Sequence, residues 1–574
     1  MKRLFLLALA SAFLTVKPAA ADPLSTEARS QLQKDIKRLE EKRREFPREE
    51  PVPGPKIITS EEETRPAAAG EEDTAFELDE ILIEGNTVMG DKLFEPAIQP
   101  CLHRAVTLKD LKSLSSEMTR IYRAQGFVTS RVYLPPQKVI DNRLTLRALE
   151  GKIGKVAVQG NRYFLARFYE DMLDVRPGSV LSYPALEESL YRLNRLPDRQ
   201  VQAFIAPEDD PEYSSLTLEV KETYPVHAYY GFNNHGTKLT HRARHHVELL
   251  HNNISGNADA LGGWMGLAEE GGFGGGTLRY ERPAAWPLAR FSKLHIESTL
   301  AESQLLKHLK PSAVESEYFG LSVGWTADWV QKPERSFSTT IGFDAKDYKT
   351  LVSGQTDSFD RMRILKLAPR LALHGAGGST LFSGDIAWGI PDLFGGSDKN
   401  ENVSRPDSGG RFFYVTPKVQ RTLRLPYDAY FSATAGGQWT WNHLTSLELF
   451  RAGGAHSVRG YPESDAVGDA GYDVSLELNI PPPWVSPDAK IPFTNYAFAR
   501  SLRFISFLDA AGTHFLERAR PDETKNEFLL GVGVGLRVML ERCLYFELDY
   551  GVPLGDKSSD NDRPQFHLAL RAGF

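Results

Sequence analysis

The sequence predicts a membrane β-barrel of about 16 antiparallel strands, preceded by an N-terminal helix and two small α+β modules. The main observation is a strict period-two alternation in four segments near the C-terminus. In the last of these, Phe566 and Phe574 share an apolar face, whereas His567 and Arg571 lie on the opposite face. Segments of this length exceed ordinary soluble strands and are long enough to cross a bilayer. One apolar face and one small or polar face is typical of outer-membrane barrels.

Composition agrees with this fold class and excludes others. The chain has 574 residues and a formal net charge of -7, and its mean hydropathy is -0.35. This hydropathy excludes a helical transporter, because such proteins contain several long apolar runs. A barrel tolerates low hydropathy because only alternate residues face lipid. The mild charge does not favour a nucleic-acid partner.

The N-terminal region contains three expected segments. Residues 1–21 are predicted to be a secretory signal peptide, because Lys2 and Arg3 precede a short apolar run and small residues precede Asp22. Residues 22–46 are predicted to form a helix whose thin apolar stripe suits a polar cavity or solvent. Pro47 ends this helix. Residues 47–75 are rich in Pro, Glu and Ala and are predicted to be a flexible linker.

An internal repeat follows the linker. The segment 81–86 is echoed by 156–161, and each ends in Gly-Asn. Each unit is predicted to run strand, helix, helix, strand, strand, with modules at 76–150 and 151–222. In the first module, Thr107 and Asp110 have the spacing of a helix N-terminal capping box. The expected later strands are 127–134 and 144–149 in the first module, and 201–206 and 216–220 in the second.

From residue 223 to 574 the pattern changes to strands separated by turns. Short and long connections alternate, as expected for a barrel with short periplasmic turns and long outer loops. The connection 481–500 breaks this alternation. Short turns are expected near 254–256, 332–334, 375–378, 425–426 and 541–542, and long connections near 303–315, 349–359, 391–409, 443–468, 512–525 and 553–563.

The sequence favours neither a metal site nor an enzyme. The four histidines between His241 and His251 suggest a metal site, but they do not share one strand face. Cys101 and Cys543 lie in segments of different character, so we expect free thiols rather than a disulfide. The glycine-rich segment 271–276 lacks the spacing of a dinucleotide loop and is predicted to be a turn leading into a strand. No catalytic nucleophile motif occurs, so no enzyme activity and no cofactor are expected.

The order of the segments (export signal, charged helix, linker, two repeats and barrel) resembles that of the TpsB family of two-partner secretion transporters, of FhaC and ShlB type. Three sequence motifs are similar to motifs of the same family. The run 126–137 is similar to that family's first POTRA domain. The tetrapeptide Val458-Arg459-Gly460-Tyr461 matches a loop motif of the wider superfamily, and Phe507-Leu508-Asp509 matches its partner motif on a later strand. The resemblance implies that Arg459 folds into the lumen and meets Asp509. The alternative is a surface loop with a solvated Arg459.

Side-chain alternation supports the first arrangement. It places Phe507 and Asp509 on one face of their strand. A carboxylate on a partly dewatered lumenal wall requires a partner, and arginine supplies a bidentate one. Gly531, Gly533 and Gly535 leave a stripe of wall without side chains, which makes room for an inserted loop.

The resemblance also implies a function and a location. It implies an outer-membrane translocator of a Gram-negative bacterium, surrounded by outer-membrane lipid and with POTRA domains in the periplasm. Its cargo would be an unfolded TpsA-type exoprotein, and the helix 22–46 would plug the barrel unless it is free in the periplasm. Phe566 and Phe574 would form the signal that the barrel-assembly machinery reads. The alternative is an assembly or insertion factor of the same superfamily.

Overall fold

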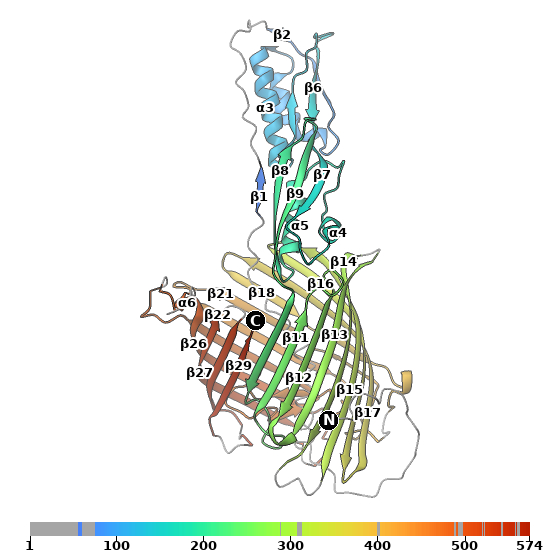
Figure 1. Cartoon of the computed structure of the whole chain (residues 1–574), viewed down its shortest axis with the longest axis vertical. Coiled ribbons are helices and arrows are strands. Elements are labelled where there is room, and N and C mark those ends of the chain that lie inside the picture. Colours follow the sequence, from blue (N-terminus) through green and yellow to red (C-terminus); the bar gives the residue numbers. More distant parts are fainter. Residues whose placement is uncertain are drawn as a thin grey trace.

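The computed structural model describes residues 56–59, 75–286, 289–306, 313–398, 402–486, 489–491, 497–518, 520–521, 523–540, 543–556, 558–559 and 563–574. The expected signal peptide and N-terminal helix lie outside these residues. Two small α+β modules stand one above the other on one end of a large barrel (Figure 1). Among the described residues, no helix combines the length and the apolar character needed to cross a membrane.

The first module packs helices against a three-stranded sheet with the strand order β3-β6-β5. Its longest helix begins at the predicted capping box, in which Asp110 N donates to Thr107 Oγ1 at 3.3 Å and Thr107 N donates to Asp110 Oδ2 at 2.8 Å. The elements are β2 (Phe76–Glu77), β3 (Glu80–Glu84), η1 (Asp91–Leu93), α2 (Glu95–Ile98), η2 (Gln99–Cys101), β4 (Ala105–Val106), α3 (Leu108–Ala124), β5 (Arg131–Tyr133) and β6 (Arg143–Leu149).

The second module repeats this order and adds one strand. Its elements are β7 (Lys152–Gln159), α4 (Ala166–Asp171), α5 (Tyr183–Asn194), β8 (Arg199–Pro207) and β9 (Tyr213–Glu222). Within the predicted linker, β1 (Ile57–Thr59) pairs in parallel with β8 and extends this sheet. The prediction of a flexible linker was therefore wrong for these three residues, because β-branched side chains suit an edge strand.

A glutamate at the equivalent position of each module closes the same turn, which shows the internal repeat in three dimensions. Glu150 accepts the amides of Thr87 and Val88 at 2.7 and 3.1 Å. Glu222, at the end of β9, accepts the amides of Arg162 and Tyr163 at 2.8 and 2.5 Å. A buried tyrosine hydroxyl also donates to each glutamate, from Tyr122 and Tyr169 respectively. Burial raises the pKa of both tyrosines.

The barrel contains 16 strand positions among the described residues and closes between its first and last strands. Its segments are β10 (Val226–Asn233), β11 (Arg244–His251), β12 (Ala260–Ala268), β13 (Phe273–Trp286), β14 (Ala289–Gln304), β15 (Val314–Gln331), β16 (Arg335–Val352), β17 (Gln355–Gly375), β18 (Gly378–Ser383), β19 (Ile386–Gly389), β20 (Phe412–Val415), β21 (Lys418–Arg424), β22 (Tyr430–Thr440), β25 (Ala470–Ile480), β26 (Leu502–His514), β27 (Asn526–Leu540), β28 (Leu544–Pro553) and β29 (Gln565–Gly573).

Two neighbouring strand positions are interrupted at the same level. β18 and β19 both pair with β17, and they are separated by Gly384 and Asp385. β20 and β21 form the next position and are separated by Thr416 and Pro417. Thr416 N donates to Asp385 O at 2.8 Å, so the two interruptions are joined to each other. Proline cannot donate to a strand ladder, which accounts for one of these breaks.

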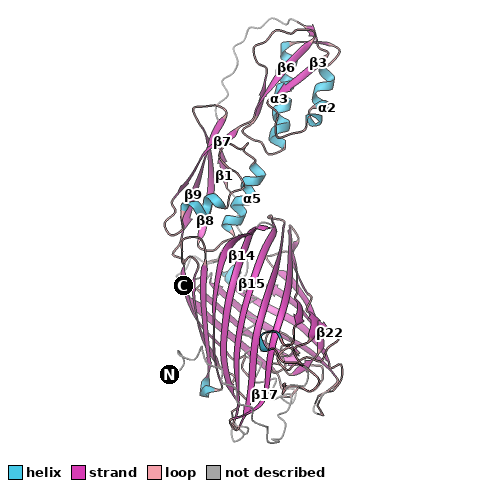
Figure 2. Cartoon of the chain, turned by 90° about the vertical axis from the view of Figure 1, so that its right-hand side faces the viewer, coloured by secondary structure: helices cyan, strands magenta, loops and turns pink. Residues whose placement is uncertain are grey.

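The long connections lie mainly at the barrel end opposite the modules (Figure 2). The prediction of a long connection at 349–359 was wrong. The strands β16 and β17 continue through this region and leave only Ser353 and Gly354 between them. Polar strands can extend beyond the bilayer without an apolar face, and their composition then resembles that of a loop. The connection 481–500 lies at the module end, where it leads into the short helix α6 (Phe498–Ser501).

The second module is held against the barrel by polar contacts. Asp198, which precedes β8, lies 2.8 Å from His227 Nε2 on β10. The other oxygen of Asp198 accepts from Asn252 Nδ2 at 2.7 Å. Lys332, in the turn between β15 and β16, forms a 2.6 Å ion pair with Glu188 of α5. These contacts fix the second module to several turns at the barrel rim.

Candidate functional site

The connection between β22 and β25 folds back into the barrel and carries the predicted loop motif. A short hairpin made of β23 (Phe450–Ala452) and β24 (Ala466–Gly468) encloses the part of the connection that carries the motif. Val458 and Tyr461 are fully buried and pack in one apolar cluster with Ala511 of β26 and Leu529 of β27. The loop therefore rests on the inner face of the barrel wall. Its tip lies at residues 458–461.

Arg459 and Asp509 form the central contact of this site. Arg459 Nε donates to Asp509 Oδ2 at 2.7 Å, and Nη2 donates to Oδ1 at 2.9 Å. The backbone amide of Arg459 also donates to Oδ2, at 3.1 Å. This is a bidentate, charge-assisted pair supplemented by a backbone bond. The Asp509 side chain is fully buried, and that of Arg459 is 5% exposed.

Further charged residues surround this pair on neighbouring strands. Arg459 Nη1 lies 2.6 Å from Glu477 Oε1 on β25 and 3.3 Å from Asp549 Oδ2 on β28. Asp549 is shared with Arg537 of β27, whose two terminal nitrogens donate to it at 2.5 and 2.8 Å. Arg537 also pairs with Glu547 at 3.1 Å. The loop arginine is thus bound to three strands at once.

An aromatic ring and bare backbone complete the arginine's surroundings. The Arg459 guanidinium carbon stands 3.6 Å from the centroid of the Phe507 ring, a close cation–π contact. At Gly531, an added Cβ would stand 2.0 Å from the Arg459 carbonyl oxygen. At Gly551, it would stand 2.5 Å from the Gly460 nitrogen. The loop can approach the wall this closely only because both positions are glycine.

The other motif residues fix the loop backbone. Gly460 has a φ of +107°, a conformation that L side chains rarely adopt. Tyr461 donates its hydroxyl to Asp556 O at 3.1 Å and accepts from Gly555 N at 2.8 Å, so it binds the outer connection after β28. Ser475 Oγ donates to Asp509 Oδ1 at 2.7 Å and orients that carboxylate.

Breaking this buried arrangement is costly. Removal of one partner from a buried ion pair leaves an uncompensated charge and costs about 3–5 kcal/mol. Asp509 and Asp549 are both fully buried, so neither carboxylate can turn to solvent while the loop stays in place. The arrangement can therefore hold the loop in one position.

The structure brings the predicted motif residues together, and it adds partners that the motifs did not indicate. Glu477, Arg537, Asp549 and Gly551 were not predicted to join this site. The sequence indicates only that these residues lie at the inward-facing positions of their strands, and many other residues lie at such positions. Of the three predicted glycines, Gly531 contacts the loop backbone. A side chain at Gly533 would meet Phe507, and one at Gly535 would meet Asp549.

The predicted terminal aromatics lie on the outer surface of the barrel. Phe566 is 58% exposed and Phe574 is 72% exposed. The Phe566 ring lies 4.8 Å from that of Tyr550 on β28. The backbone of Phe574 exchanges two hydrogen bonds with Ala228 of β10, at 3.2 and 3.3 Å. The chain end thus closes the seam between the last and first strands.

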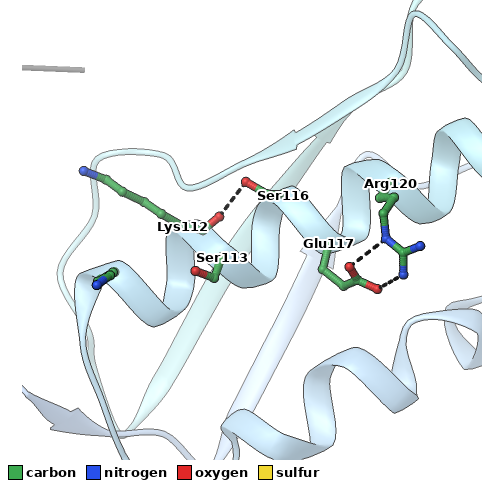
Figure 3. Close-up of a pocket in the computed structure, with 6 residues that line it drawn as sticks. Lys112, Ser113, Ser116, Glu117 and Arg120 are labelled. Carbon is green, nitrogen blue, oxygen red and sulfur yellow. Dashed lines mark hydrogen bonds and ion pairs between the residues drawn. The ribbon is translucent and has the colours of Figure 1, made fainter. Parts of the chain in front are cut away.

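Other residues considered from sequence lie away from the loop. Cys101 is buried in the first module, Cys543 is exposed in the turn after β27, and both are free thiols. Figure 3 shows a shallow polar depression on α3, where Glu117 and Arg120 form a two-bond ion pair at 2.5 and 2.8 Å. Its lining residues all come from this one exposed helix: Lys109, Lys112, Ser113, Ser116, Glu117 and Arg120.

Comparison with known proteins places these features in a family. Residues 76–151 match the model of the POTRA domain, ShlB-type, and residues 212–538 match that of haemolysin secretion/activation protein ShlB/FhaC/HecB. The chain is 23% identical over 440 residues to the outer membrane transporter CdiB of Escherichia coli, covering 74% of this chain and 72% of that protein. It is 19% identical over 477 residues to the heme/hemopexin transporter protein HuxB of Haemophilus influenzae, covering 81% of each.

A solved structure shows the same fold over nearly the whole chain. CdiB from Escherichia coli superposes with a TM-score of 0.72 at 19% identity, and the match covers 97% of this chain and 100% of that one. The family model spans more than half of the 574 residues. The chain therefore belongs to the ShlB/FhaC/HecB family of two-partner secretion transporters, which are outer-membrane proteins, not enzymes, with POTRA domains in the periplasm.

Proposed function

We propose that this protein binds an unfolded TpsA-type exoprotein in the periplasm through its POTRA domains and secretes it through the barrel. An extended cargo chain can add to an open sheet edge through main-chain hydrogen bonds. The chain then crosses the lumen and folds outside, and its folding free energy biases the direction of export. The hemolysin type of cargo is one member of the class that this proposal covers.

The observation that carries the proposal is the lumenal loop fixed by Arg459. A passive pore needs no loop bound to three inner strands, whereas a protein-conducting pore must stay closed until cargo arrives. The Arg459 cluster supplies a discrete closed state, because a buried ionic contact is either formed or broken. We refer to the contact between Arg459 and Asp509 as the loop lock.

The remaining segments have proposed roles consistent with this function. Residues 1–21 direct export, residues 22–46 plug the barrel, and residues 47–75 connect the plug to the first POTRA domain. The POTRA domains occupy 76–150 and 151–222, and the barrel occupies 223–574. Phe566 and Phe574 provide the signal by which the barrel-assembly machinery inserts the protein among outer-membrane lipids.

The test is Arg459→Ala in cells that co-express a candidate cargo, chosen by searching the reading frames beside this gene for an exported protein rich in β-repeats. We expect secretion to fall by about tenfold or more, since loss of a buried pair costs about 3–5 kcal/mol. The amount of folded barrel in the membrane should change far less, because the strand ladder does not include this side chain. Secreted cargo and heat-modifiable barrel are measured in the same samples.

The matched control is Arg335→Ala, which removes an exposed arginine from the barrel end near the POTRA domains. It should leave both secretion and barrel amounts unchanged. Wild-type secretion by Arg459→Ala, at a normal surface level, would contradict the role of the loop lock. Absence of secretion by the wild-type protein itself would contradict the proposed function.

A further inference from the structure

The connection that carries Arg459 has a second buried contact with the barrel, in the residues that precede its hairpin. Leu447 is fully buried and belongs to an apolar cluster on the barrel wall. The other buried members come from four consecutive strands: Phe273 of β13, Ala301 of β14, Tyr318 of β15 and Tyr348 of β16. The side chain of Leu447 therefore packs on the inner face of the wall formed by these strands.

The next residue, Glu448, adds a buried ion pair at the same wall. Lys346 Nζ of β16 donates to Glu448 Oε1 at 2.6 Å, and the two side chains are 2% and 1% exposed. The hydroxyl of Tyr414 on β20 donates to Glu448 Oε2 at 2.8 Å. Both carboxylate oxygens are thus bonded away from solvent, where such charge-assisted contacts are strong. We call Leu447, Glu448 and Lys346 the far anchor.

The far anchor and the loop lock lie on opposite walls of the barrel. Among the 16 described strand positions counted from β10, the cluster around Leu447 lies on positions four to seven, β13 to β16. Arg459 contacts strands at positions 12 to 15, β25 to β28, which is half way around the barrel. Figure 1 shows β15 and β26 on opposite sides. One connection therefore bridges the lumen from wall to wall.

Release of the loop lock alone leaves this connection bound inside the barrel. Glu448 and Arg459 are 11 positions apart in the sequence, so Glu448 still holds the same connection to β16 when Arg459 leaves Asp509. Separating Glu448 from Lys346 is unfavourable by itself, because it leaves two buried charges without partners. The two contacts share no residue and lie far apart, so their contributions to closure add.

We propose that the far anchor is a second closing contact of the pore, and that the loop leaves the lumen only when the far anchor and the loop lock have both released. This inference rests on the proposed secretion function, since the cargo is what displaces the loop. A cargo chain must then separate Leu447 from its apolar cluster and Glu448 from Lys346, in addition to separating Arg459 from Asp509.

The first test compares Glu448→Gln with Glu317→Gln in the full-length protein in lipid nanodiscs. Glu317 of β15 is 60% exposed and lies 3.8 Å from Lys349 of β16, so its variant removes the same charge from an exposed lysine–glutamate pair. The amides of residues 446 and 448 are each hydrogen-bonded at 3.0 Å and report on the far anchor. Their exchange should accelerate by at least about 100-fold in Glu448→Gln, since Lys346 loses its buried counter-charge. Glu317→Gln should match the wild type.

A second variant weakens the far anchor without changing a charge. Leu447→Ala should accelerate exchange of the same two amides by at least about tenfold, because it leaves a cavity in the apolar cluster. The amide of Arg459, which donates to Asp509, should stay within about threefold of the wild type in both variants, because the loop lock is intact. Wild-type protection of residues 446 and 448 in either folded variant would overturn the far anchor.

The second test follows both contacts during export. Leu447→Cys and Val458→Cys are made separately in a background with Cys101→Ala and Cys543→Ser, and each places a thiol where the closed pore buries the native side chain. A membrane-impermeant maleimide should label neither thiol efficiently in resting cells. Co-expression of the candidate cargo should raise labelling of both by at least about fivefold, since labelling follows the released population. Labelling of only one of the two thiols during secretion would overturn joint release.

The two tests separate the far anchor from the function on which it rests. Amide exchange needs no cargo, so it decides whether Leu447 and Glu448 hold the loop even if this protein secretes nothing. Secretion of cargo while both thiols stay unlabelled would overturn joint release. Absence of secretion by the wild type would overturn the proposed function and would leave the outcome of the exchange test standing.

Discussion

Gly531→Ala tests directly whether the loop tip must touch the barrel wall. The added methyl carbon would stand 2.0 Å from the Arg459 carbonyl oxygen. Contacts between such carbon and oxygen atoms are normally about 3.3 Å or longer, so the loop must retreat by about 1.3 Å. Such a retreat would lengthen the 3.1 Å bond from Arg459 N to Asp509 beyond hydrogen-bonding range.

The magnitude follows from the cost of overpacking. Inserting a methyl group into close-packed structure costs about 1–3 kcal/mol, which lowers the population of the docked loop by about 5- to 150-fold. The assay is amide exchange at Arg459 and at Gly555, whose amide donates to Tyr461 of the same loop. Both amides should exchange faster by that factor. Barrel assembly should persist, because Gly531 keeps its pairing with Asp509 and Pro553 in the strand ladder.

The control is Gly342→Ala on β16. Gly342 has the same parity as the buried inward residues of its strand, such as Asp344 and Lys346, and an added methyl there would meet nothing closer than 3.5 Å. This variant should show wild-type exchange at both amides. The reasoning is refuted if Gly531→Ala retains wild-type protection, because the loop would then not depend on the bare wall.

Two further predictions concern the POTRA domains. Glu222→Ala removes the acceptor of the Arg162 and Tyr163 amides and should strongly accelerate the exchange of these two amides, since bonds to a charged group contribute about 1.5–3 kcal/mol each. Glu219→Ala, which changes an exposed residue on the same strand, should leave their exchange unchanged. The backbone and side-chain bonds from Thr107 lower the pKa of Asp110 below 3.8. Its stabilisation of α3 is therefore present above pH 3.8 and lost as the pH falls through the lowered pKa. Amide exchange in α3 of the wild type should therefore lose protection as the pH falls through this range. Asp110→Asn should remove this pH dependence. The same pH dependence in the wild type and in Asp110→Asn would contradict the role of Asp110 in the cap.

The alternation of side chains was sufficient to predict the barrel and four of its last five strands, β25, β27, β28 and β29. It failed at 349–359, where Ser353 and Gly354 form a tight turn between strands that extend past the bilayer. A strand outside lipid needs no apolar face, so its sequence resembles a loop. The three-residue strand β1 was hidden for a different reason, since it lies in a Pro-rich segment and pairs with a strand far along the chain.

The candidate site was only partly predictable. Arg459 and Asp509 belong to motifs, whereas Arg537 and Asp549 are ordinary inward-facing charges whose meeting depends on strand register. Register across a barrel is set by the whole ladder and is absent from any local pattern. The buried ion pairs of Arg405 with Asp469 and Glu523 could not be predicted at all, because these carboxylates lie 64 and 118 positions away in irregular connections.

The charges around the loop lock have a consequence for the ions that the pore admits. The cluster contains two guanidinium groups, from Arg459 and Arg537, and four carboxylates, from Glu477, Asp509, Glu547 and Asp549. Its formal charge is therefore -2 with the loop in place, and it becomes -3 when Arg459 withdraws. Rings of carboxylates attract cations and repel anions. Undocking the loop thus exposes an acidic patch on β25 to β28, and under the proposed secretion function this patch favours the passage of basic over acidic stretches of polypeptide.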